Sequence, residues 1–180
     1  KYSKSYWKKA SYKNTVSTIL SFNTKSEICS KCGGQSIHIN YLLQDSVDQN
    51  LNWLPGIDKN HPLYVVTRYI DEVFKNIDKS SEFNLAQELK ELSNPPYGFY
   101  QTYACIGMVA FAMRKYVNKI FGLDGNVREA QHLVDDIVNV FKSWENEKND
   151  HSLNFNLQSR DEGDLCKHFI SAFNLDHIKG

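Results

Sequence analysis

The fold of this chain is decided by residues 94–125, which read NPPYGFYQTYACIGMVAFAMRKYVNKIFGLDG. The segment opens with two consecutive prolines, which disfavour the interior of a helix, and continues with a glycine that permits a sharp bend. We therefore expect a structural turn at the start of the segment, before any regular element begins. The residues of this turn are Pro95, Pro96, Tyr97 and Gly98.

One long helix is predicted to follow the turn, over residues 99–121. Residues 104–113 are apolar on every face, which is typical of a helix buried at the centre of a domain. This apolar run is too short to cross a bilayer, which needs about 20 residues. We expect Gly122 to cap the helix and residues 123–126 to form a turn. The side chains expected to be buried are Ala104, Val109 and Ala112.

The composition is that of a packed protein domain. Of the 180 residues, 41% are hydrophobic and 13% aromatic, enough for one core with or without an arm. No signal peptide and no membrane-spanning segment is recognised. The four cysteines do not form a disulfide framework, which indicates a reducing, cytoplasmic setting. Because Lys1 is not an initiator methionine, we expect a piece of a larger protein.

A basic arm is predicted at the N-terminus, although the formal net charge of the chain is zero. Residues 1–37 hold seven lysines and one acid, and the first 13 interleave lysines with aromatic residues. One interpretation is a nucleic-acid contact, in which lysines bind phosphates and aromatic rings stack on bases. The favoured alternative is a solvated arm whose aromatic residues dock on the domain. The candidate phosphate contacts are Lys1, Lys4, Lys8, Lys9 and Lys13.

Cys29 and Cys32 form a C-x-x-C pair that is followed by two glycines. Half of a zinc ribbon has this pattern, because two thiolates converge on one metal ion. A second C-x-x-C pair is missing, and the glycines would break the helix that a thioredoxin-type redox site needs. The sequence favours a plain turn, with a zinc site or redox chemistry as alternatives.

The remaining pattern predicts a mainly α fold with a small β component. Residues 1–80 are interpreted as the basic arm plus a mixed region, and residues 81–180 as a winged-helix-like helical module built around the apolar helix. The alternation of Ile37, Ile39 and Tyr41 predicts a short strand. Helices are expected at residues 63–77, 84–93, 128–147 and from 159 onward, with a strand at residues 153–157 and with His61 and Asn84 as helix-start residues.

The segment LSNPPYGF, residues 92–99, together with the apolar helix and the helix–strand–helix order that follow it, resembles a module of very large bacterial ATPases from phage-defence and restriction-type systems. The resemblance covers the C-terminal half. It implies a non-catalytic part outside the nucleotide-binding domain, with a coupling or binding role. An arginine that often follows the turn in those proteins is absent here, where the residues are Phe99, Tyr100 and Gln101.

No phosphate-binding loop, H-E-x-x-H motif or G-x-S-x-G motif is present. The adjacent acids Asp135 and Asp136 are interpreted as solvated surface. We therefore predict an interaction or coupling module that contacts the parent polypeptide, another subunit or DNA. The alternatives are a zinc-binding or catalytic domain organised around Cys29 and Cys32, and a small hydrolase assembled from scattered histidines and acids.

Overall fold

A computed structural model of the chain describes residues 9–32, 36–77, 83–122, 124–143 and 154–156. The fold over these ranges is mainly α-helical with a small β component, as the sequence predicts. Its elements in chain order are α1 (Lys9–Ser21), α2 (Lys25–Lys31), α3 (Ser36–Gln44), α4 (Pro62–Asn76), β1 (Phe83–Asn84), α5 (Leu85–Ser93), α6 (Tyr103–Met113), the 3₁₀ helix η3 (Arg114–Tyr116), β2 (Phe121–Gly122), α7 (Ala130–Ser143) and β3 (Asn154–Asn156).

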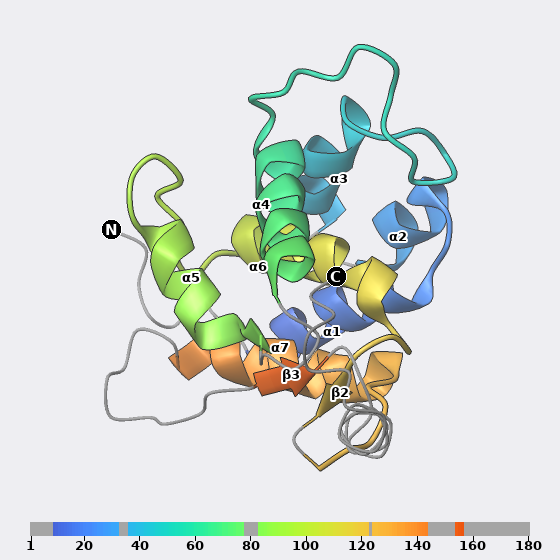
Figure 1. Ribbon diagram of the computed structural model, residues 1–180. Coiled ribbons are helices and arrows are strands. Elements are labelled where there is room, and N and C mark those ends of the chain that lie inside the picture. The colour runs from blue at the N-terminus through green and yellow to red at the C-terminus, as the bar shows by residue number, and fades with distance from the viewer. Residues whose placement is uncertain (1–8, 33–35, 78–82, 123, 144–153, 157–180) are drawn as a thin grey trace, which may run out of the picture.

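Helix α6 is the centre of the molecule. Every residue from Cys105 to Met113 is buried, because α1, α3, α4 and α7 pack around it. Figure 1 shows α4 crossing in front of α6, with α1 and α7 beneath it. Helix α3 approaches closely at Gly107, where an added Cβ would lie 2.7 Å from Cδ1 of Ile39. A larger residue at this crossing would require the end of the Ile39 side chain to shift.

The predicted central helix is too long at both ends. It begins at Tyr103, where the Oγ1 of Thr102 accepts a hydrogen bond from the backbone N–H of Cys105 at 3.0 Å. It ends at Met113, and η3 follows directly. The chain then reverses at Asn118, whose φ of 60° lies in the left-handed region. Gly122 belongs to β2 rather than to a helix cap, so that prediction is wrong.

Burial within α6 follows the prediction except at its start. Val109 and Ala112 are fully buried, whereas Ala104 is only half-buried. Ala104 is the second residue of the helix, and its neighbours Tyr103 and Cys105 are buried, so the exposure is confined to one side of the first turn. Its predicted complete burial is therefore wrong.

The helices around α6 bear out the 3.6-residue pattern. Helix α4 starts at His61, whose Nδ1 accepts a hydrogen bond from the N–H of Leu63 at 3.3 Å. Helix α5 starts at Asn84, whose side chain accepts from the N–H of Gln87 at 3.0 Å. The apolar faces of α4, α5 and α7 are buried as predicted. Residues 159–180, where a last helix is predicted, lie outside the described ranges.

A small antiparallel sheet joins distant segments in the order β1-β3-β2. Phe83 pairs with Phe155, and Gly122 pairs with Phe155 from the other side. The predicted strand around Phe155 is therefore present. Helix α7 separates β2 from β3, whereas the wing of a winged helix is a hairpin of consecutive strands, so that comparison stays a prediction.

The segment around Ile39 is helical, so the strand predicted there is wrong. In α3, Ile39 and Leu43 face the core one turn apart, while the side chains of Ile37 and Tyr41 are 56% and 70% exposed. The alternation of apolar residues therefore reflects two exposed side chains and not the face of a sheet.

Both halves of the sequence contribute to one hydrophobic core. Helix α1 packs on α6 and α7, and α4 packs on α6. The predicted boundary after residue 80 falls within residues 78–82, which are not described, and stays a prediction. Within the described ranges, no helix is long and apolar enough to cross a membrane.

Candidate functional site

The PPYG turn is held in one conformation by backbone hydrogen bonds. The N–H of Tyr97 donates to the carbonyl of Asn94 at 3.0 Å, and the N–H of Phe99 donates to the carbonyl of Leu92 at 2.9 Å. The Pro95–Pro96 peptide bond is cis, and Gly98 has a φ of 62°. Because the ring of Phe99 is buried in the core, the turn is anchored to the body of the molecule.

A groove of about 340 Å³ lies between this turn and the first half of α4. Most of its lining is apolar, and Asn60 contributes a polar group at its wall. Val65 and Tyr97 also border a second hollow of about 490 Å³ along the outer face of α4, so the two hollows are adjacent. The residues lining the groove are Asn60, Pro62, Val65, Val66, Pro96, Tyr97, Phe99 and Met108.

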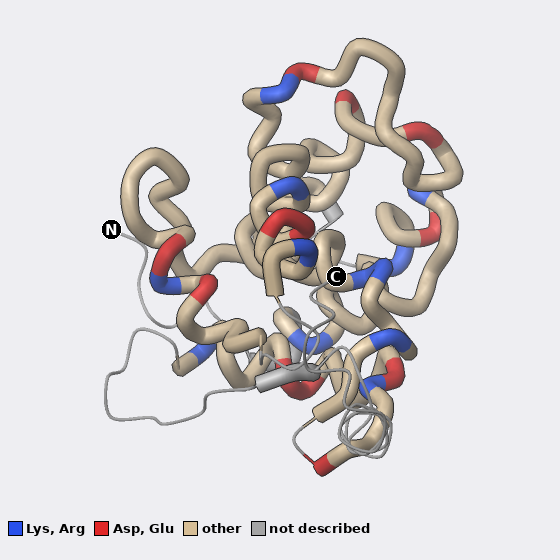
Figure 2. The backbone as a smooth tube through the Cα atoms, in the orientation of Figure 1, with Lys and Arg blue, Asp and Glu red and all other residues tan. Residues whose placement is uncertain are grey.

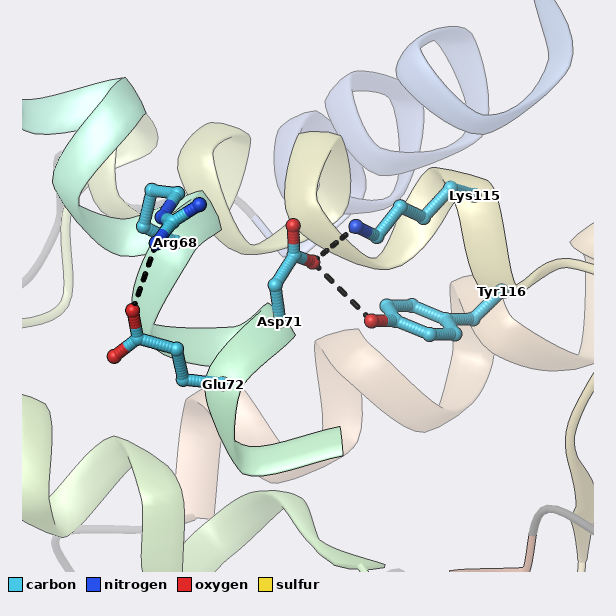
Figure 3. A network of polar contacts seen from close by, with 5 residues as sticks. All are labelled: Arg68, Asp71, Glu72, Lys115 and Tyr116. Atoms are coloured by element: carbon cyan, nitrogen blue, oxygen red, sulfur yellow. Dashed lines mark hydrogen bonds and ion pairs between the residues drawn. The ribbon is translucent and has the colours of Figure 1, made fainter. Parts of the chain in front are cut away.

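The outer hollow is bordered by aromatic and charged side chains. The ring of Tyr97 packs edge-on against Tyr69, with 5.5 Å between centroids. Burial and the neighbouring Glu88 raise the pKa of Tyr69, whose hydroxyl donates to Oε2 of Glu88 at 2.6 Å. Arg68 pairs with Glu72 at 3.1 Å, as Figure 3 shows. Lys59 has no ion-pair partner in the described part of the chain, so it leaves a positive charge at this rim.

Of the candidate phosphate contacts, Lys13 is the one whose side chain the structure describes. Nζ of Lys13 pairs with Oδ1 of Asp135 at 2.7 Å and thereby links α1 to α7. Tyr12 is buried against Tyr103 and Phe141, which agrees with the docking interpretation of the aromatic residues. The side chain of Lys9 is outside the description, as are Lys1, Lys4 and Lys8 entirely. Basic and acidic residues are intermixed over the described chain (Figure 2).

Cys29 and Cys32 lie at the end of α2 rather than in an open turn. Cys29 is half-buried, and Cys32 is buried as the C-cap of the helix. Burial raises the pKa of Cys32 to about 11 and also raises that of Cys29, which favours thiols over metal-binding thiolates. Over the described ranges, no group of three or more His, Cys, Asp or Glu side chains is placed to hold a metal ion.

The acidic pair of α7 is not uniformly solvated. Asp135 is exposed and pairs with Lys13, but the side chain of Asp136 is only 17% exposed and lies 3.5 Å from Nε of Arg128. Burial raises the pKa of Asp136, and Arg128 opposes that rise. The surface interpretation is therefore wrong for Asp136. Both acids therefore form ion pairs within the fold.

No model of a protein family matches this chain, and no curated protein sequence or solved structure is significantly similar to it. The functional argument therefore depends on geometry. The sequence pointed to the PPYG turn but not to the α4 side of the groove. Val65 was the available signal, because it is an apolar residue that lies off the buried face of an otherwise amphipathic helix.

Proposed function

We propose that this chain is a non-catalytic interaction module whose PPYG groove binds a segment of another protein surface. The groove itself carries the proposal, because an apolar hollow beside a hydrogen-bonded, rigid turn binds without a large ordering cost. The resemblance of the turn to that of large phage-defence ATPases supports a partner in the parent polypeptide or in another subunit, in a bacterial cytoplasm.

The chemistry of the groove specifies the bound segment. One or two apolar or aromatic side chains fit against Val65, Tyr97 and Met108. A neighbouring carboxylate then faces Lys59 at the rim, where the adjacent Arg68 is already paired with Glu72. An extended peptide with an apolar anchor followed by an acid matches both features.

Selection from a displayed library of random 12-residue peptides tests this proposal. Peptides enriched on the chain are expected to share an apolar anchor and an acid, and to lose about tenfold or more in affinity on Val65→Gln. Val65 is half-exposed and glutamine is a good helix former, so this variant should fold. The matched control is Tyr41→Gln, which changes an exposed residue of α3 and should leave binding intact.

Two outcomes would overturn the groove as the binding site. The first is enriched peptides that bind Val65→Gln as tightly as the unaltered chain, and the second is a library that yields no enriched peptide. The DNA alternative is tested in parallel by anisotropy of labelled duplex and single strands over a salt series. Binding that weakens steeply with salt and disappears when residues 1–8, which precede α1, are removed would assign nucleic acid to the arm instead.

A further inference from the structure

A third hollow, of about 440 Å³, which we call the polar hollow, lies on another side of α4 and is polar where the groove is apolar. It is formed where the end of α1, the loop before α4, α4 itself and η3 meet. Segments far apart in the sequence therefore converge here, and they bring side chains that the proposed interaction groove does not use. The residues that matter are Asn23, Trp53, Thr67, Asp71, Arg114 and Lys115.

The hollow carries one uncompensated positive charge. Asp71 on α4 accepts from both residues of η3 that face it, pairing with Lys115 and accepting from the hydroxyl of Tyr116 at 3.2 Å (Figure 3). The guanidinium of Arg114, by contrast, is half-buried and has no ion-pair or hydrogen-bond partner among the residues that the structure describes. Burial lowers the pKa of Arg114, which records the cost of desolvating this charge.

Other polar groups that line the hollow are also unsatisfied or free to bind. Oγ1 of Thr67 is buried and lacks a hydrogen-bond partner within the described ranges. Asn23 and Asn118 add side-chain amides to the wall. A buried polar group without a partner is costly, so such groups are uncommon unless a ligand or water completes them.

The backbone is strained around the same hollow. Leu51 and Asn118 have φ values of 63° and 60°, and they are the non-glycine residues of the described chain in the left-handed region. Both line the hollow. A bulky residue such as leucine rarely adopts this conformation, and strain of this kind concentrates at ligand sites.

The remaining wall is aromatic. Trp53 packs against Phe111 of α6 with 5.7 Å between ring centroids, and against Tyr64 of α4 at 5.1 Å. The indole is thereby fixed in the wall of the hollow that Arg114 also lines. A flat apolar body can lie against these rings while a polar group reaches Arg114.

We propose that this hollow binds a small organic anion, with a carboxylate or phosphate group on Arg114 and an apolar, planar body against Trp53 and Phe111. A guanidinium binds both anions with two parallel hydrogen bonds, which explains an arginine here. The side chains of Asn23 and Asn118 donate to the remaining anion oxygens. The inference does not depend on the groove being an interaction surface.

NMR titration of the full chain with phenylacetate and with phenyl phosphate tests the proposal. Each anion is expected to shift the indole N–H signal of Trp53, identified by its loss in Trp53→Phe. Neutral phenylacetamide is expected to bind at least about tenfold more weakly, since a hydrogen bond to a charged group contributes about 1.5–3 kcal/mol. Tighter binding of one anion assigns carboxylate or phosphate as the preferred group, and either preference supports the proposal.

Three variants separate charge recognition from a general effect on folding. Arg114→Gln should weaken both anions by about tenfold or more. Asp71→Asn should increase the affinity for both anions severalfold, because it removes a negative charge from the wall of the hollow and frees Lys115. Arg68→Gln is the control, since this arginine is on the same helix but pairs with Glu72 outside the hollow. The affinity of the Arg68→Gln variant for both anions should not change.

The proposal is overturned if phenylacetamide binds as well as phenylacetate, or if Arg114→Gln binds both anions unchanged. It is also overturned if the Asp71→Asn variant has the amide spectrum of a folded chain and binds the anions more weakly. No shift of the Trp53 signal at 10 mM of either anion, a concentration on the order of a weak fragment's dissociation constant, has the same consequence.

Discussion

The PPYG groove and the polar hollow differ in chemistry although both border α4. Val65 and Tyr69, one turn apart, line the hollows beside the PPYG turn, whereas Thr67 and Asp71, also one turn apart, line the polar hollow. Residues two apart are about 200° apart around a helix axis, so these pairs lie on opposite sides. A single helix thereby separates the PPYG groove from the polar hollow, and each is expected to respond to its own substitutions.

The two hollows also depend differently on solvent. Binding in the groove is expected to come mainly from apolar contact, which salt changes little, with a smaller salt-sensitive contribution from the pairing of the peptide acid with Lys59. Binding at Arg114 comes from charge, which salt screens over about 10 Å at 0.1 M. A comparison of the two affinities between low and high salt would therefore distinguish the sites within one molecule.

Removing the support that both hollows share should have the largest effect. Val109 is fully buried in α6, and Val109→Asp places an unpaired charge in the core. We expect a loss of about 5 kcal/mol or more, comparable with the whole stability of a domain. Circular dichroism and urea denaturation should show an unfolded chain, and both binding activities should disappear together.

The matched variant is Ala104→Asp in the same helix. Ala104 is half-buried at the second position of α6, where the helix dipole favours a negative charge. This variant should fold and keep both sites. A chain unfolded by Ala104→Asp would show that the first turn of α6 is as closely packed as its middle.

Phe99→Ala should damage one hollow and leave the other. Phe99 is 4% exposed and anchors the PPYG turn, and truncation of a buried phenylalanine costs about 3–5 kcal/mol. Peptide binding should be lost, while phenylacetate binding, measured on the folded fraction at low temperature, should be retained. Equal losses at both sites would contradict the separation of the two hollows by α4.

Thr67→Val should stabilise the free chain by about 1 kcal/mol, because it removes a buried hydroxyl that has no partner among the described residues. Thr15→Val in α1 is the control, since its Oγ1 is equally unsatisfied but does not line the hollow. Urea denaturation should show similar gains for both. Only Thr67→Val should weaken the binding of phenylacetate. Weaker binding in both variants would indicate an indirect effect of packing.

The sequence predicted the elements that depend on local patterns. The spacing of Leu63, Val66 and Ile70 predicts α4, and the Asn84 cap with Gln87 predicts the start of α5. The apolar run of α6 predicts a central helix, because a helix that is apolar on every face must be buried whichever elements surround it. These features survive because each depends on residues within one or two turns.

The features that failed depend on distant contacts. The chain reversal at Asn118 follows no glycine or proline, so the sequence gives no sign that the central helix ends at Met113. The polar hollow draws on Asn23, Trp53 and Asp71, which no short motif connects. Its one local signal is the pair Arg114-Lys115 directly after an apolar helix, where charged residues emerge beside the core.

Substitution of Asp48 should have the smallest effect on stability and binding. Asp48 acts on the polar hollow through the loop that carries Leu51. Its Oδ1 accepts from the N–H groups of Asn52 at 2.9 Å and Asn50 at 2.8 Å. These bonds, led by that from Asn52, lower the pKa of Asp48. A carboxyl with a lowered pKa stabilises the folded state above its unfolded pKa of about 4, and this contribution is lost as the pH falls through the folded value.

Asp48→Ala should therefore be less stable than the unaltered chain at pH 6, and the difference between their urea midpoints should shrink as the pH falls to about 3. The comparison isolates Asp48, because Asp124, whose pKa is also lowered, titrates in both chains. The stability of Asp48→Asn, which keeps an acceptor oxygen, should lie between those of Asp48→Ala and the unaltered chain at pH 6. Since Asp48 supports the strained Leu51, phenylacetate affinity at pH 6 should fall slightly in Asp48→Ala, while peptide binding stays unchanged. A pH-independent difference would assign the role of Asp48 to loop geometry rather than to its charge.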